Sequence, residues 1–327
     1  MKLLNFGTPN YLDVYKNQEF KTLIEVGIEK YGYVFGGSRL SNLCPDIYDK
    51  AESKFAKWCC TEDCTIVSSG TFASAILMKN ILNYYDEAYY FTQKGIHPSV
   101  LFAIDSKLPE EFKNIKELIE RVNTCDSDSK KYIIFNSINP VNLDRIGDNE
   151  LKKLKELNNI TLIVDESHGF GLCPEKSLGN NLKEMGFEYI IVGSLAKGLG
   201  LNGGIIAGNT DIIDIIRNDK LWIGASPAAP FLFYAFVNEE QVYVEELRKL
   251  NRNFDEFLEK CPDIDSFDFI DRFPVFVAQK AISVPDYIRI SSFSYPNRAR
   301  YPIQKIVLNS GHTIDDIQIL CSEIKFQ

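Results

Sequence analysis

The chain has 327 residues, of which 45% are hydrophobic and 25% charged, ordinary values for a folded protein. This length predicts two domains, or one large α/β domain with an appendage. Lysine and arginine total 36 against 45 aspartate and glutamate residues, giving a formal net charge of −9. An acidic chain without a basic block argues against nucleic acid or an anionic membrane as a partner.

The N-terminal segment and the cysteines together favour a cytoplasmic protein. The segment MKLLNFGTPNYLDV lacks the apolar stretch of a signal peptide, and no apolar run approaches the roughly 20 residues of a membrane span. The eight cysteines are scattered, and Cys59, Cys60 and Cys64 have no second ligand cluster at zinc-like spacing. We therefore expect free thiols and no metal site.

From about residue 64, short β-branched runs alternate with longer amphipathic segments. The strand-like runs are CTIVSS, YIIFNS, TLIVDES, YIIVGS and GGIIAG. This alternation predicts an α/β fold with a mostly parallel central sheet. TLIVD and YIIVG lack polar alternation, which is typical of strands buried on both faces. Ligands of such sheets bind at the carboxyl ends of the strands, so the polar residues there are the candidates for function.

The C-terminal part predicts a smaller domain. A long helical segment leads to Pro262, which breaks the pattern. RFPVFVAQ, YIRISSFSYP and QKIVLNS then indicate strands, and HTIDDIQILCSEI indicates a final helix. We expect an N-terminal arm and active-site loop over residues 1–45, a large domain over 46–250 and a small α+β domain over 251–327.

Three strand ends carry candidate functional residues. Ser69, Gly70 and Thr71 open a helix, and this pattern suits a phosphate site although it is common in α/β proteins. Asp165 closes a buried strand, where a carboxylate favours a positive partner such as a protonated ring nitrogen; a solvent-exposed turn is the alternative. Lys197 lies among glycines, which suits a covalent role for a desolvated amine.

The segment Gly198–Gly203 matches the GxGxxG pattern of nucleotide-binding proteins. We disfavour that interpretation because the match lies late in the chain. The following GGIIAG also predicts a strand where the motif requires a helix.

These residues, with His97 in GIHPSV, stand in an order and spacing that resembles the fold type I pyridoxal-phosphate enzymes, and among them the α-oxoamine synthases. NYLD at Asn10 is similar to the family's NYLG, and FGGSRLSN to its GGSRL loop. VDESHGFG and VGSLAKGLG are similar to VDDSHxxG and GTLGKALG. The resemblance covers nearly the whole chain. It implies an aspartate-aminotransferase-like fold, pyridoxal 5′-phosphate as cofactor and a homodimer with shared active sites.

The resemblance also implies roles for individual residues. Lys197 would form the Schiff base with the cofactor, Asp165 would pair with its pyridine nitrogen, and His168 would contact its 3-oxygen. His97 would stack on the ring. The phosphate would be held by Ser69, Gly70, Thr71, Ser194 and, from the other subunit, Ser226.

For the substrate carboxylate, the resemblance implies Asn10, Ser137 and a C-terminal arginine, with Ser137 also counted among the cofactor-binding residues. Matching IRISSF to the family's LRIS places the arginine role on Arg289. Matching the longer NSGHTIDDI to AHTxxDI places it on Lys305, which we prefer although lysine lacks the bidentate fork of arginine. Two further candidates are Arg298 and Arg300, although a solvent-exposed loop would also account for arginines at these positions.

The reaction implied is condensation of a small amino acid with an acyl thioester, with release of CO2 or the free thiol. Acyl coenzyme A is the implied second substrate, but NSINPVN replaces the family's SMDG and no residue specific for coenzyme A is identified. An aminotransferase on the same scaffold is the alternative. A third interpretation is a pyridoxal-phosphate-binding protein without turnover, against which the intact lysine, aspartate and histidines argue.

Overall fold

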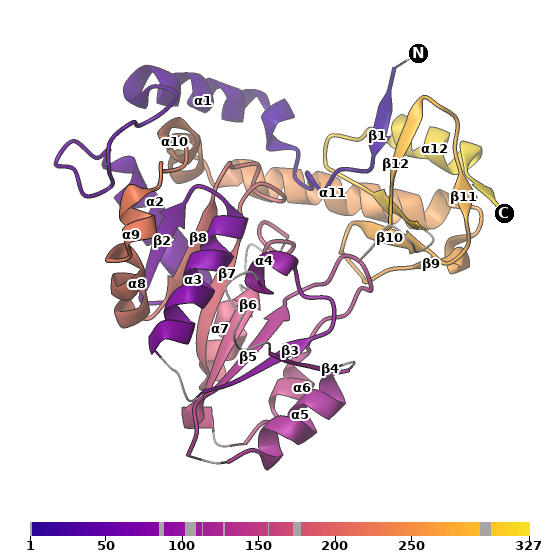
Figure 1. Cartoon of the computed structure of the whole chain (residues 1–327). Coiled ribbons are helices and arrows are strands. Elements are labelled where there is room, and N and C mark those ends of the chain that lie inside the picture. The colour runs from indigo at the N-terminus through magenta and orange to yellow at the C-terminus, as the bar shows by residue number, and fades with distance from the viewer. Residues whose placement is uncertain are drawn as a thin grey trace.

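The computed structural model describes residues 2–84, 88–101, 109–112, 114–126, 128–155, 157–172, 178–294 and 302–327. A seven-stranded sheet lies at the centre of a large unit, and a five-stranded sheet forms a smaller unit beside it (Figure 1). The expected α/β fold with a mostly parallel central sheet is confirmed. In the part of the chain described here, no helix is long and apolar enough to cross a membrane.

The central sheet has one parallel block and one reversed strand. Strands β4, β3, β5, β6 and β7 are parallel, and β8 is antiparallel to both β7 and β2. The parallel block therefore has its carboxyl ends at one edge. In spatial order the strands are β2 (Asp63–Val67), β8 (Gly204–Gly208), β7 (Glu188–Ser194), β6 (Ile160–Asp165), β5 (Lys131–Asn136), β3 (Tyr89–Gln93) and β4 (Glu110–Phe112).

Strand β6 shows why the sheet needs a helical layer on each face. Leu162 and Val164 belong to one hydrophobic cluster and Ile163 to another, because successive side chains of a strand point to opposite faces. Helices α3 and α8 contribute to the cluster of Ile163, and α2, α5 and α7 to the other. The bounds are α2 (Ile47–Cys59), α3 (Gly70–Tyr84), α5 (Ile115–Thr124), α7 (Leu178–Glu184) and α8 (Thr210–Arg217).

The segment DNELKKLKELNN, which reads as amphipathic in the sequence, forms the short helix α6 (Asp148–Leu151) and the 3-10 helix η2 (Leu157–Asn159) instead of one long helix. The side chain of Asn123 donates to the Lys153 carbonyl and accepts from the Lys155 amide, both at 2.9 Å. These backbone groups thus have a side-chain partner outside any helix. Leu154 is buried in the core at this turn.

The smaller unit contains the predicted C-terminal strands and final helix, together with an N-terminal strand that was not predicted. Strand β1, near the N-terminus, pairs in parallel with β12, so the first residues of the chain belong to the C-terminal sheet. A capping box between Thr313 and Asp316 begins the last helix. The elements are β1 (Leu4–Phe6), β12 (Ile288–Phe293), β13 (Ile303–Val307), β10 (Val275–Ala278), β9 (Phe267–Asp268) and α12 (Ile314–Glu323).

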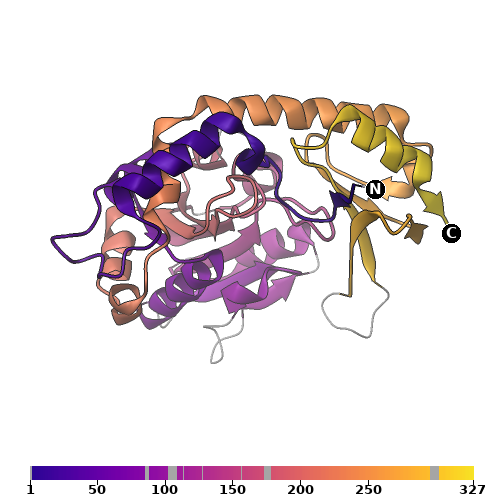
Figure 2. The same cartoon turned by 90° about the horizontal axis from the view of Figure 1, so that it is seen from above.

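Helix α11 (Gln241–Lys260) connects the two units and runs along both, as the long orange helix of Figure 2 shows. The boundary that we expect at residue 250 lies inside this helix. Helix α1 packs against α10 over the large unit. The remaining elements are η1 (Val14–Lys16), α1 (Gln18–Tyr31), α4 (Pro98–Leu101), η2 (Leu157–Asn159), α9 (Lys220–Gly224), α10 (Pro230–Asn238), η3 (Ile264–Ser266), β11 (Ile282–Ser283) and β14 (Lys325–Phe326).

The close packing of the loop after β7 makes a testable prediction. A Cβ at Gly198 would lie 1.9 Å from the Phe170 carbonyl oxygen, so Gly198→Ala must displace backbone. We expect a loss of about 1–3 kcal/mol in unfolding free energy, measured by urea denaturation. Gly224→Ala is the matched control, because no atom lies within 4 Å of its Cβ position. Equal midpoints for the two variants would contradict the prediction.

Candidate functional site

A cavity of about 350 Å³ lies at the carboxyl ends of the central strands, within the size range of small-molecule sites. It brings together residues from four separate segments of the chain. Seven of its lining residues were predicted from the sequence: Ser69, Gly70, Thr71, His97, Asp165, Ser194 and Lys197.

The start of α3 forms one wall of this cavity and suits an anion. Ser69 Oγ accepts a hydrogen bond from the Phe72 amide at 3.2 Å and so caps the helix. The first amides of a helix have no partner within it, and the helix dipole makes this end positive. A Cβ at Gly70 would lie 2.6 Å from Ser194 Cβ, so only glycine allows this close approach. The wall therefore fits a phosphate group.

Asp165 presents a carboxylate to the cavity from the end of β6. Its side chain is largely buried, and Oδ1 accepts a hydrogen bond from the Ser167 amide at 2.9 Å. Oδ2 has no hydrogen-bond partner among the residues that the structure describes. A buried carboxylate with one free oxygen suits a positively charged ring nitrogen.

Lys197 follows β7 and contacts His168 across the site. The two nitrogens, Lys197 Nζ and His168 Nε2, lie 2.9 Å apart. Burial lowers the pKa of Lys197, and the charge of Asp165 only partly opposes this. Burial also holds the pKa of His168 well below its usual value, with the charges of Lys197, Lys305 and His97 acting in the same direction. In both groups the uncharged form is therefore more favoured than in an exposed side chain of the same type.

The glycines after Lys197 do not form a nucleotide-binding turn. Gly198–Gly203 connects two antiparallel strands, β7 and β8, so the element that directly follows it is a strand and not a helix. The GxGxxG interpretation is therefore excluded by the local structure. The segment instead holds the lysine against the turn after β6.

His97 lines the cavity from the segment after β3. Its Nδ1 accepts from the Ser99 amide at 3.2 Å and lies 2.7 Å from Ser99 Oγ. Burial lowers the pKa of His97, the charge of Asp165 raises it, and that of Lys197 lowers it. A neutral imidazole fixed at Nδ1 can contact an aromatic ring in the cavity.

Lys305 reaches the same region from the small sheet. Its Nζ donates to the Pro140 carbonyl at 3.2 Å and lies 4.8 Å from the centre of the Phe293 ring. Burial, and then the charge of Lys197, lower the pKa of Lys305 to about 8. Arg289, by contrast, is exposed on β12, where it pairs in register with Asn5.

Ser137 begins the loop that Lys305 contacts, but it does not line the cavity. Its amide donates to the Asp165 carbonyl at 3.0 Å, which places it beside the end of β6. Among the described residues, neither Ser137 Oγ nor Glu166 Oε2 has a hydrogen-bond partner, although both atoms are buried. Burial raises the pKa of Glu166 to about 7, against an opposing effect of the nearby Ser137 hydroxyl.

Several predicted residues lie away from the cavity. Asn10 is exposed, and Ser226 is exposed beside a separate shallow hollow that Arg39 and Trp222 also line. Arg298 and Arg300 fall outside the described residues. None of the seven cysteines that the structure describes forms a disulfide bond. In the same described ranges, no group of three or more His, Cys, Asp or Glu side chains could hold a metal ion.

Other residues of the site were not predicted from the sequence. Tyr11 has its hydroxyl 2.7 Å from His168 Nδ1, although it stands next to Asn10 in the NYLD motif that was singled out. Its position in that motif was the available signal. The other missed residues line the cavity, as small polar side chains with no distinctive pattern: Ser74, Ser99, Ser167 and Asn202.

The titration of Lys305 can be measured directly. We expect half-deprotonation near pH 8, because burial and the neighbouring Lys197 charge disfavour the ammonium form. Competitive acetylation at trace reagent, read by mass spectrometry across pH, gives a midpoint for each lysine. Lys50, whose pKa its hydrogen bond with Asp46 raises, is the exposed control. A Lys305 midpoint equal to that of Lys50 would refute the prediction.

The cavity fits pyridoxal phosphate on its own geometry. The start of α3 suits the phosphate, Asp165 suits the pyridine nitrogen, and Lys197 supplies an amine whose pKa burial lowers. His97 also lines the cavity, whereas His168 does not line it but contacts the Lys197 amine.

Comparison with known proteins agrees with this fit. A putative 8-amino-7-oxononanoate synthase of Methanococcus vannielii is 25% identical over 351 residues, which are 98% of this chain and 91% of that protein. A serine palmitoyltransferase of Bacteroides thetaiotaomicron is 25% identical over 260 residues, 76% of this chain and 64% of that protein.

Solved structures show the same fold. The 8-amino-7-oxononanoate synthase of Francisella tularensis gives a TM-score of 0.73 at 22% identity, covering 97% of this chain and 95% of that one. A high-resolution structure of SPT with PLP gives a TM-score of 0.79 at 14% identity, covering 98% and 86%. The aspartate-aminotransferase-like fold is thus confirmed, and the second of these structures was solved with PLP.

The expected resemblance to the α-oxoamine synthases is confirmed by the same relatives. The family profile described as aminotransferase class I and II matches residues 2–284. The chain therefore belongs to the aminotransferase class I and II family of pyridoxal-phosphate-dependent enzymes.

Proposed function

We propose that this enzyme joins the α-carbon of a small amino acid to the acyl carbon of a thioester. A carbon–carbon bond forms, the carbon–sulfur bond breaks, the thiol leaves with a proton, and the amino-acid carboxylate leaves as CO2. The names of the relatives support this reaction class. The observation that carries the proposal is the partly buried Lys197 amine, which lies 2.9 Å from His168 Nε2 and lines the same cavity as Asp165.

The cofactor would be held by the residues that line the cavity. When bound, pyridoxal phosphate supplies electron withdrawal that stabilises negative charge on the substrate α-carbon. Asp165 holds the positive charge of the pyridine nitrogen and so maintains that withdrawal. Lys197 would hold the cofactor covalently, and as a free amine it would move a proton at the substrate α-carbon.

The substrate carboxylate would bind between Lys305 and Ser137. One observation supports this placement: Lys305 Nζ contacts the Pro140 carbonyl, in the loop that Ser137 begins. A carboxylate next to Lys305 would also restore its ammonium form, since an opposite charge raises a lysine pKa.

We further propose a homodimer in which Ser226 serves the other subunit. Its exposure outside its own chain's cavity supports this role. The loop over residues 33–43 carries four exposed apolar side chains that a second copy would cover, namely Tyr33, Val34, Leu40 and Leu43. The free thiols support a cytoplasmic location.

A substrate screen tests the reaction class. Small amino acids, each combined with acyl-CoA donors of short and long chain, should yield free thiol only when both substrates are present. Lys197→Ala should abolish thiol release, because no other residue supplies the covalent amine. Conversion of the amino acid to its keto acid without thiol release would instead identify an aminotransferase. Absence of both products would indicate binding without turnover.

Substitution of the two basic candidates tests the carboxylate site. Lys305→Ala should raise the amino-acid KM by roughly 30-fold or more, since loss of a buried charged partner costs about 2–5 kcal/mol of binding. Arg289→Ala is the matched control and should stay within a few-fold, as expected for an exposed charge. The cofactor absorbance should be unchanged in both variants. A larger rise in KM for Arg289→Ala than for Lys305→Ala would instead place the carboxylate site at Arg289 on β12.

A further inference from the structure

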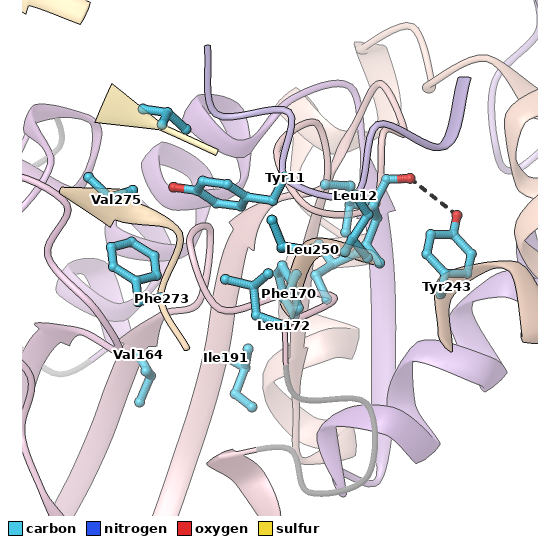
Figure 3. Packing of buried hydrophobic residues seen from close by; sticks show 14 of the residues in the cluster. Tyr11, Leu12, Val164, Phe170, Leu172, Ile191, Tyr243, Leu250, Phe273 and Val275 are labelled. Atoms are coloured by element: carbon cyan, nitrogen blue, oxygen red, sulfur yellow. Dashed lines mark hydrogen bonds between the residues drawn. The ribbon is translucent and has the colours of Figure 1, made fainter. Parts of the chain in front are cut away.

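A chain of three polar side chains connects the N-terminal segment to the Lys197 amine. Tyr11 is fully buried, and its hydroxyl lies 2.7 Å from His168 Nδ1. His168 Nε2 in turn lies 2.9 Å from Lys197 Nζ. Figure 3 shows the Tyr11 ring beside Phe273, against which it packs edge-on with ring centres 5.9 Å apart. Apolar packing thus fixes the phenol. Among the described residues, the contact with His168 Nδ1 is the one hydrogen bond of its hydroxyl.

The position of each proton follows from the acceptors that are present. Burial raises the pKa of Tyr11 far above its usual value, so the phenol keeps its proton. The low pKa of His168, set by burial and then by Lys197, Lys305 and His97, keeps its ring neutral, with one N–H. Among the described residues, His168 Nδ1 is the single acceptor within reach of the Tyr11 hydroxyl. Nδ1 therefore carries no hydrogen, and the one N–H hydrogen of the ring is on Nε2.

The opposite tautomer is disfavoured by the same contact. A hydrogen on Nδ1 would donate to the phenol oxygen and leave the buried Tyr11 hydroxyl proton without an acceptor. An unsatisfied buried donor costs about 1–3 kcal/mol. His168 Nε2–H therefore points at Lys197 Nζ, which must accept this hydrogen bond with the lone pair of an uncharged amine. A lysine ammonium has no lone pair and would meet a second donor there.

We propose that Tyr11 is a positioning residue: by fixing the tautomer of His168, it favours Lys197 as the free amine that the chemistry requires. Once the amine is engaged elsewhere, the same Nε2–H is available as a donor to a ring oxygen of the cofactor. The role concerns the state of the lysine before any substrate binds. It therefore holds for an acyltransferase and for an aminotransferase alike.

Nitrogen NMR of the cofactor-free protein tests the tautomer directly. The chain has only three histidines, so ¹⁵N-histidine labelling gives three ring systems, assigned with His97→Gln and His312→Gln. We expect His168 to show the hydrogen on Nε2 and an unprotonated Nδ1 at neutral pH. A hydrogen on Nδ1 in the unmodified protein would overturn the proposal, and this measurement requires no variant to fold.

The second measurement compares Tyr11→Phe with a matched control. Tyr243→Phe removes another fully packed phenol, whose hydroxyl donates to the Leu199 carbonyl at 3.1 Å, the dashed line in Figure 3. In Tyr11→Phe we expect averaged His168 nitrogen shifts and a rise in the pH midpoint of Lys197 acetylation. At neutral pH, Lys197 should react at least about threefold more slowly, the change that half a pH unit gives.

The control should leave both readouts of the site unchanged, although it loses stability. Tyr11→Phe with an unaltered His168 spectrum and an unaltered Lys197 midpoint would show that the phenol only packs against Phe273. Neither readout uses a substrate, so failure of the proposed acyl transfer would leave this result unaffected.

Discussion

Burial of the Lys197 amine at the carboxyl ends of β6 and β7 is the constraint on which the rest of the site depends. An ammonium loses hydration there, which lowers the pKa of Lys197 and favours the uncharged, nucleophilic amine more than in an exposed lysine. The burial is possible because glycine at position 198 lets the loop lie directly against the Phe170 carbonyl. His168 then gives the amine its polar contact, and Asp165 supplies negative charge in the same cavity.

The strands and their terminal residues were predictable because both depend on local sequence. An apolar run followed by the first polar side chain locates Asp165 and Ser194, and Lys197 stands out among the glycines that follow, without knowledge of the rest of the chain. Tyr11 could not be found in this way, because its partner His168 lies 157 residues further on. The early end of α6 also depends on a distant residue, Asn123, whose side chain bonds to the backbone beyond the helix.

The choice between Arg289 and Lys305 was open in the sequence for a related reason. Both alignments depend on short stretches of sequence, whereas the two residues differ in where the fold places their side chains. Strand β13 pairs with β10 and β12, which places Lys305 inside the small sheet with its amine toward Pro140. Arg289 lies on the neighbouring strand with its side chain exposed. Lysine also carries its charge at one atom, so it binds a carboxylate with less directional preference than arginine does.

The parallel pairing of β1 with β12 sets the order in which the protein can be completed. Leu4 pairs with Ile288, so the first strand has no partner until most of the chain has been synthesised. Tyr11 follows β1 closely, and its contact with His168 is positioned from that strand. The large sheet can form earlier from shorter-range pairs, because contacts between near neighbours cost less loop-closure entropy. A nascent chain would thus hold Lys197 and Asp165 in place before the tyrosine arrives, which makes competence for catalysis one of the last properties that folding confers.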